Sequence, residues 1–150
     1  MNQDYIIPKP WPILEEGFLP ENNESSESIF SIGNGAMGQR ANFEETYTGD
    51  SFQGSYIAGV YYPDKTKVGW WKNGYPEYFA KVLNSCNWIG INLKINNEEI
   101  DIHQQKVISF HKALDMKKGI LTRNVTLELN NKQQVFNFLS KLVLLTGEKP

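Results

Sequence analysis

Apolar and polar residues alternate most clearly in the C-terminal half of the chain. Isoleucine and leucine take every second position from Ile89 to Ile95, and large side chains alternate with Thr, Asn and Glu from Leu121 to Leu129. A period of two is typical of a strand with one buried face. The strands expected in this half cover residues 89–95, 98–103, 107–110, 121–129 and 133–139. Polar turns are expected between them at 96–97, 116–119 and 130–132.

The N-terminal half is less regular. β-Branched and aromatic residues at 55–62 predict a strand, whereas 78–83 fits either a strand or a single helical turn. Trp11 to Leu14 is expected to be an edge strand, because the prolines around it cannot donate to a strand ladder. The polar stretch 20–27, PENNESSE, is expected to form a surface loop.

Glycines 33, 35 and 38, within the stretch Glu27 to Glu45, spell G-x-G-x-x-G. A dinucleotide site of this type needs a helix directly after the glycines, and residues 39–50 carry no apolar helical stripe. We therefore favour a β-hairpin, with Asn34-Gly35 as a two-residue type I′ turn and Gly38 at a close approach or bulge. Cofactor binding by these glycines is the lesser alternative.

The expected strands recur at a spacing of about 8–12 residues, with Asn- and Gly-rich turns between them, as in all-β sandwiches and barrels. A chain of 150 residues with 40% hydrophobic residues can form one domain with its own core. We predict an all-β fold, an antiparallel β-sandwich, as a single domain over residues 1–150.

Charge and rare residues narrow the class of function. The formal net charge is −2, so no basic face for nucleic acid or an anionic membrane is expected. One cysteine, Cys86, cannot form an internal disulfide, and with only two histidines no metal site is expected. The N-terminus lacks a basic signal-peptide region, and the apolar run at 142–145 is too short to span a bilayer. We expect a cytoplasmic protein.

No catalytic constellation is visible. Carboxylates occur as the adjacent pairs Glu15-Glu16, Glu44-Glu45 and Glu98-Glu99. Adjacent residues of a strand point to opposite faces, so no pair can flank one bond by itself. The pair after the glycine hairpin is best placed for a structural role, such as pairing with Arg40. His103 and His111 match no metal or triad spacing, so no catalytic residue is assigned.

Four aromatic residues form the main candidate binding feature: Trp70, Trp71, Tyr75 and Tyr78. They lie in or beside the long loop 63–77, and loops of this length are often functional. Flat aromatic faces suit sugar rings and also another protein domain. We predict carbohydrate or domain-interface contacts here. Packing under the loop and contact between protomers are the alternatives.

Several segments taken together resemble the N-terminal domain of glycoside hydrolase family 65, which includes bacterial phosphorylases of maltose, kojibiose and trehalose and some hydrolases. The resemblance runs from about Trp11 to Leu129 in family order. The matching segments are SESIFSIGNGAMGQRANFEE, GDSFQGSYIAGVYYPD, PEYFAKVLN, NWIGINLKINNEEIDI and LDMKKGILTRNVTLEL.

The resemblance implies a mutarotase-like super-sandwich, which in the family is joined to an (α/α)6 barrel carrying the catalytic glutamate and the phosphate site. It implies the non-catalytic N-terminal domain of a maltose-type disaccharide phosphorylase acting by inverting phosphorolysis. Inorganic phosphate is the co-substrate and no metal or organic cofactor is expected. The implied partners are an α-linked glucose disaccharide, the barrel and, in the complete enzyme, a second subunit. A stand-alone carbohydrate-binding module and the N-terminal domain of a family 65 hydrolase are the alternatives.

Two departures from the family pattern qualify this reading. Ala41 stands where the family often has glycine. After Gln134 the family usually continues with arginine, phenylalanine and serine, whereas this chain reads VFNFLSKLVLLTGEKP. We therefore expect a fragment of a longer enzyme, with a sandwich incomplete at its C-terminal end and without the catalytic barrel. By itself it is expected to be a structural, dimerisation and carbohydrate-associated domain.

Overall fold

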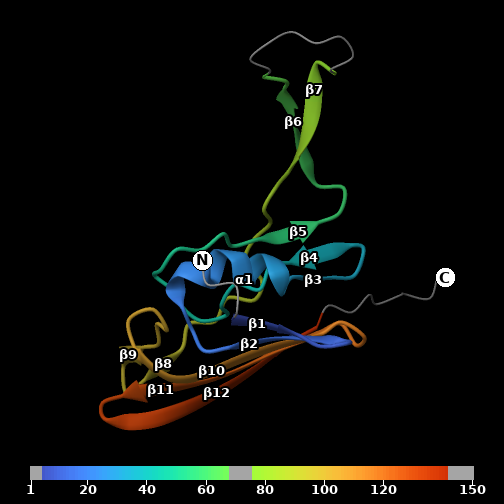
Figure 1. The fold of residues 1–150 in the computed structure, drawn as a ribbon. Coiled ribbons are helices and arrows are strands. Elements are labelled where there is room, and N and C mark those ends of the chain that lie inside the picture. The colour runs from blue at the N-terminus through green and yellow to red at the C-terminus, as the bar shows by residue number, and fades with distance from the viewer. Residues whose placement is uncertain (1–4, 68–75, 142–150) are drawn as a thin grey trace, which may run out of the picture.

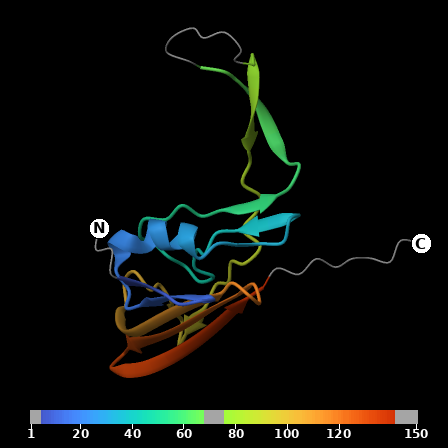
Figure 2. The same cartoon turned by 45° about the vertical axis from the view of Figure 1, so that its right-hand side comes forward.

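The computed structural model describes residues 5–67 and 76–141 and confirms an all-β, antiparallel architecture (Figure 1). A five-stranded sheet forms one layer. A short helix and a three-stranded sheet lie over one face of it, and a two-stranded ribbon projects away from this body (Figures 1 and 2). None of the helices in the described ranges is long and apolar enough to cross a membrane.

The five-stranded sheet has the order β1-β2-β10-β11-β12. Its strands are β1 (Ile6–Pro8), β2 (Pro12–Glu16), β10 (Lys106–Asp115), β11 (Ile120–Leu129) and β12 (Lys132–Ser140). Along β11 every second residue is buried, as the alternation predicted. The turn into β12 uses Asn130 and Asn131, both with positive φ, which is the type I′ geometry that asparagine tolerates.

Two strand predictions in this sheet need correction. The N-terminal segment is not an edge strand, because β2 pairs with both β1 and β10. Pro12 is tolerated as the first residue of β2, and the short β1 forms the edge instead. The strand expected at 107–110 extends to Asp115. Phe110, Lys112 and Leu114 alternate on its buried face, and the lysine at a core-facing position breaks the apolar alternation that would have revealed the strand's length.

The predicted loop 20–27 is wrong, because this segment is helical. A 3-10 turn, η2 (Pro20–Asn22), leads into α1 (Asn23–Ile29). Proline near the start of the turn and acidic residues in the first turns favour helix formation. The buried side of the helix consists of polar residues, including Ser26 and Glu27, so the sequence has no apolar stripe that would predict a helix here.

The glycine stretch forms the predicted hairpin with a different turn. The second layer contains β3 (Ile32–Gly33), β4 (Met37–Gln39) and β5 (Ser55–Ile57). Gly33 pairs with Gly38, so the central turn residues are Gly35 and Ala36. Only Gly35 of these has positive φ, which fits type II′ and not type I′. The Asn34 carboxamide oxygen accepts hydrogen bonds from the backbone N–H groups of Ala36 and Met37, at 3.0 and 2.7 Å.

The other strand predictions hold in part. The segment predicted at 55–62 divides into β5 and β6 (Tyr61–Lys65), and the ambiguous 78–83 is strand β7 (Tyr78–Val82). The long strands expected at 89–95 and 98–103 shrink to β8 (Lys94–Ile95) and β9 (Glu98–Glu99). Residues 88–93 are not a strand, because the Ile91 N–H donates to the Glu44 carbonyl at 2.6 Å instead of to a ladder.

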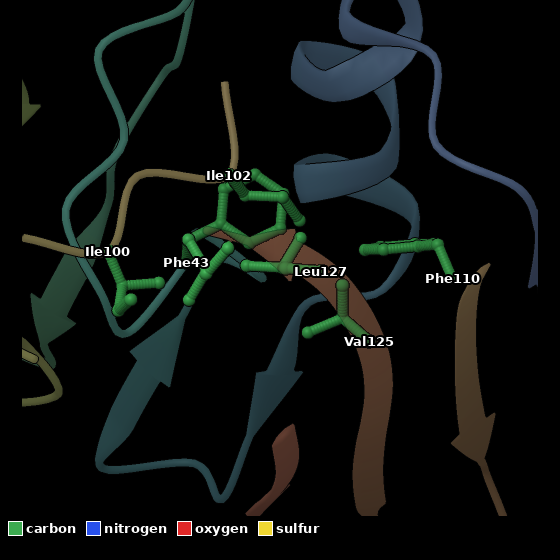
Figure 3. Close-up of a cluster of buried hydrophobic side chains, with 7 residues drawn as sticks. Phe43, Ile100, Ile102, Phe110, Val125 and Leu127 are labelled. Carbon is green, nitrogen blue, oxygen red and sulfur yellow. The ribbon is translucent and has the colours of Figure 1, made fainter. Parts of the chain in front are cut away.

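Two apolar clusters fill the space between the layers. The larger consists of Phe43, Ile100, Ile102, Phe110, Val125, Leu127 and Leu129, of which Figure 3 labels the first six. The smaller consists of Phe30, Ala41, Leu114 and Leu121. Residues from both halves of the sequence meet in the larger cluster, so the chain packs around a shared core.

Leu127 is fully buried in the larger cluster, so Leu127→Ala removes apolar contacts and leaves a cavity. We expect it to lower the free energy of unfolding by about 2–5 kcal/mol. Val135→Ala, at an exposed position of β12, is the control and should change it by no more than about 0.5 kcal/mol. Urea unfolding of the two variants measures the difference, and equal values would contradict this assignment of the core.

Candidate interaction site

The ribbon of β6 and β7, which we call the arm, carries the described part of the predicted aromatic cluster. Tyr78 begins β7, pairs with Lys65 and is exposed. Trp70, Trp71 and Tyr75 lie outside the described residues. The structure therefore places one of the four predicted contact residues on the projecting arm (Figures 1 and 2).

Both faces of the arm expose large apolar side chains. The register pairs Tyr61 with Val82 on one face and Asp64 with Phe79 on the other. Tyr61, Tyr62, Phe79 and Val82 are all exposed. A two-stranded ribbon without a covered face is only marginally stable in water. Exposed apolar area of this extent is typical of a protein interaction surface.

Among the described residues, the polar side-chain contact between the two strands of the arm comes from Lys81, at the surface. Lys81 forms an ion pair with Asp64, and its hydrogen bond lowers the pKa of that carboxyl group. The Lys81 ammonium also lies 5.8 Å from the centre of the Phe79 ring. Such exposed pairs stabilise little, so the arm depends on other contacts to stay ordered.

An apolar groove of about 310 Å³ lies where the arm joins the body. Its walls come from the tip of the β3–β4 hairpin and from β5 to β7, and include Gly35, Met37, Gly38, Ile57, Val60 and Val82. The glycine stretch and the segment SYIAGVYY, both prominent in the sequence, therefore meet at one surface. The glycines lack side chains, so a partner can approach the backbone closely here.

A buried ion network holds the segment after β4 against the sheet. Arg123, on the inner face of β11, donates to Glu45 at 2.7 Å and to Glu44 at 2.8 Å. Burial acts to lower the pKa of Arg123, but the hydrogen bonds and charges of Glu45 and Glu44 outweigh it and raise that pKa. The guanidinium carbon also lies 4.7 Å from the ring centre of Phe43 and 4.1 Å from that of Phe138.

This network corrects one prediction about the acidic pairs. Glu44-Glu45 is structural, as predicted, but its partner is Arg123 and not Arg40. Arg40 lies 4.0 Å from the Glu27 carboxylate instead. The sequence did contain a signal for Arg123. In the alternating pattern it falls on the same face as Leu121 and Val125, and a charge on a core face requires a buried partner.

A second buried charge, Lys112, was missed by the sequence reasoning. Its ammonium lies 3.1 Å from Glu15 and over three aromatic rings, at 5.3 Å from those of Phe30 and Phe110. Burial lowers the pKa of Lys112, and the Glu15 charge opposes this. The Ser26 hydroxyl of α1 donates to the same Glu15 carboxylate at 2.8 Å. The pair thus ties α1 to β2 and β10.

The remaining candidate residues do not converge on a catalytic centre. His111 contacts Glu16 at 2.7 Å, whereas His103 lies edge-on to Tyr47 with ring centres 5.5 Å apart. Burial, followed by the charge of Glu27, raises the pKa of Tyr47 to about 12. In residues 5–67 and 76–141 no group of three or more His, Cys, Asp or Glu side chains could hold a metal ion.

Comparison with known proteins identifies the family. The profile of the family "Glycosyl hydrolase family 65, N-terminal domain" matches residues 13–142. The chain belongs to glycosyl hydrolase family 65. Maltose phosphorylase of Bacillus subtilis (strain 168) is 50% identical over 132 residues, which is 88% of this chain and 17% of that enzyme. The α,α-trehalose phosphorylase of Thermoanaerobacter brockii is 38% identical, over 79% of this chain and 16% of that enzyme.

A solved structure supports the same family assignment. It comes from the human microbiome and carries a provisional kojibiose phosphorylase assignment. It matches this chain with a TM-score of 0.79 and 31% identity, over 90% of this chain and 18% of the other. This family 65 chain thus spans about a sixth of the length of the relatives it matches.

The Arg123 network generates a stability prediction. Arg123→Met leaves Glu44 and Glu45 without their cation, and breaking a buried ion pair in this way should lower the free energy of unfolding by about 3–5 kcal/mol. Lys106→Met removes the exposed pair with Glu128 and should cost about 0–1 kcal/mol. Urea unfolding compares the two. A small loss for Arg123→Met would show that the network does not hold the layers together.

Proposed function

We propose that this family 65 chain is the non-catalytic N-terminal domain of a disaccharide phosphorylase of the maltose type. The observation that carries the proposal is the 50% identity to a maltose phosphorylase, against 38% and 36% to a trehalose and a kojibiose phosphorylase. The substrate is then an α-linked glucose disaccharide. The co-substrate is inorganic phosphate, with no metal or organic cofactor.

The proposed reaction is inverting phosphorolysis. A carboxylic acid protonates the glycosidic oxygen as its bond to the glucose carbon breaks, while a phosphate oxygen bonds to that carbon from the opposite face, giving glucose 1-phosphate. The acid and the phosphate site belong to the part of the enzyme beyond the matched segment. In support, the buried carboxylates of Glu15 and Glu45 and the partly buried carboxylate of Glu44 are engaged in ion pairs, which gives them a structural role.

Within the enzyme the domain serves as a docking element. The arm and the apolar groove at its base pack against the catalytic barrel or against the second subunit of a homodimer. Support comes from the exposed apolar residues on both faces of the arm. The chain also matches only about a sixth of its relatives' length, so in those enzymes the domain has a much larger remainder to pack against. The proposed location is the cytoplasm, where the exposed thiol of Cys86 needs no disulfide partner.

Two measurements test the assignment together. The chain alone, incubated with maltose and phosphate, should release no glucose 1-phosphate. A chimera in which residues 13–142 replace the matching segment of the Bacillus subtilis maltose phosphorylase should keep maltose phosphorolysis. Release by the isolated chain would place chemistry in this domain. A folded but inactive chimera would remove the maltose-type assignment.

The same chimera tests the docking role of the arm. Tyr61→Ser combined with Val82→Ser makes one arm face polar, and both positions are exposed, so the melting temperature of the isolated chain should not change. Light scattering should detect a larger share of monomer, and phosphorolysis should fall.

Trp11→Ser is the matched control, because Trp11 is also exposed and lies beside Lys117, away from the arm. An arm variant that assembles and reacts like this control would remove the docking role. If both variants show the same effect, the change results from the loss of exposed apolar side chains in general and not from the arm.

A further inference from the structure

A second groove, distinct from the one at the base of the arm, has a mixed polar and apolar lining. It encloses about 590 Å³ between residues 88–91 and the C-terminal end of β12. We call it the Trp88 groove. Its walls include Trp88, Ile91, Phe138, Glu44, Ser140 and Lys141. Small-molecule sites typically enclose roughly 300–1,000 Å³, so one or two sugar rings fit this space.

The walls of the Trp88 groove are held by specific hydrogen bonds. The Ile91 N–H donates to the Glu44 carbonyl at 2.6 Å, which fixes the 88–91 segment. The Glu44 carboxylate accepts from Arg123 at 2.8 Å and from the Ser140 hydroxyl at 3.0 Å, which fixes the opposite wall. A groove that is ordered before binding loses little entropy when a ligand enters.

The polar groups of the groove complement hydroxyl groups. Trp88 lines this groove, and its indole N–H has no hydrogen-bond acceptor among the described residues. The N–H is closed off from solvent, so a shift of the surrounding side chains is needed before a ligand oxygen can accept from it. The Glu44 carboxylate and the Ser140 oxygen can accept from hydroxyl donors, and the Lys141 ammonium can donate. A sugar hydroxyl both donates and accepts. Trp88, Ile91 and Phe138 supply the apolar surface that the C–H faces of a sugar ring require.

Charge selects a neutral ligand. Glu44 is paired with Arg123, and Arg123 is also paired with Glu45, so the buried side of the groove carries no excess of positive charge. A phosphate or nucleotide would meet the Glu44 carboxylate without a dedicated cation cluster. An uncharged polyol meets no such repulsion.

We propose that the Trp88 groove is a binding site for a neutral saccharide, with a glucose disaccharide as its ligand class. The choice of glucosides rests on the proposed function, whereas the binding itself requires only this domain. Binding would place a sugar at the junction of the 88–91 segment and β12, away from the arm.

The test uses the ¹⁵N-labelled 150-residue chain, titrated with maltose and, in separate samples, with trehalose, kojibiose and inorganic phosphate. The indole N–H signal of Trp88, identified by its loss in Trp88→Phe, should shift with saturation on adding a disaccharide. Phosphate should leave it in place. The signal of Trp11 is the internal control and should not move.

Two matched variants separate binding in the groove from a general effect. Ile91→Arg places a long charged side chain at a half-exposed wall position and should weaken maltose binding by at least about tenfold, the equivalent of one or two lost contacts. Val135→Arg, at an exposed position of β12 outside the groove, should bind maltose like the unmodified chain. Dispersed spectra of both variants confirm that they are folded.

Absence of a saturable shift, or equal binding by Ile91→Arg and the unmodified chain, would overturn the saccharide site. Phosphate displacing the disaccharide would reassign the groove to anions. These results are separable from the proposed function, because the chimera's phosphorolysis of maltose is measured independently. A chimera that reacts while the isolated chain binds no sugar would remove the saccharide site alone.

Discussion

The buried guanidinium of Arg123 fixes how the two layers of this domain meet. A charge in an apolar interior is tolerated only when opposite charges and hydrogen bonds replace its water. Glu44 and Glu45 supply both. The cation is neutralised only when the segment after β4 lies at one place along β11. Phe43 precedes them in the chain and is thereby held against the same guanidinium and in the larger apolar cluster. Apolar packing tolerates small shifts, whereas this directional pair does not.

A second set of buried polar contacts extends the same constraint to α1. Glu27 of that helix accepts the Phe52 backbone N–H at 2.7 Å, so the helix and the chain leading into β5 are held together. The ion pair of Lys112 and Glu15 joins the sheet to the helix, because the Ser26 hydroxyl of α1 donates to Glu15. The arm begins only a few residues after β5 and inherits its direction from this fixed body.

Local patterns predicted the parts of the fold that local physics decides. The alternation of β11 and the paired asparagines before β12 both report backbone geometry that neighbouring residues determine, and both predictions are confirmed. The helix α1 and the 88–93 segment could not be predicted in this way, because partners distant in sequence stabilise them: Glu15 for Ser26 and Glu44 for Ile91. For the Arg123 network, the alternation indicates a charge on a core face, but it does not identify the carboxylates that pair with it.

The two grooves differ in the chemistry of their walls, and this difference separates their proposed roles. The groove at the base of the arm is apolar and glycine-rich, and exposed aromatics continue it along the arm, so it suits a protein surface. The Trp88 groove places a carboxylate, a hydroxyl and an unpartnered indole N–H beside apolar walls, so it suits a ligand with many hydroxyl groups. The carboxylate of that groove belongs to Glu44, which also anchors Arg123. The contact that holds the layers together therefore also shapes the saccharide site, and a change at Glu44 cannot alter one without the other.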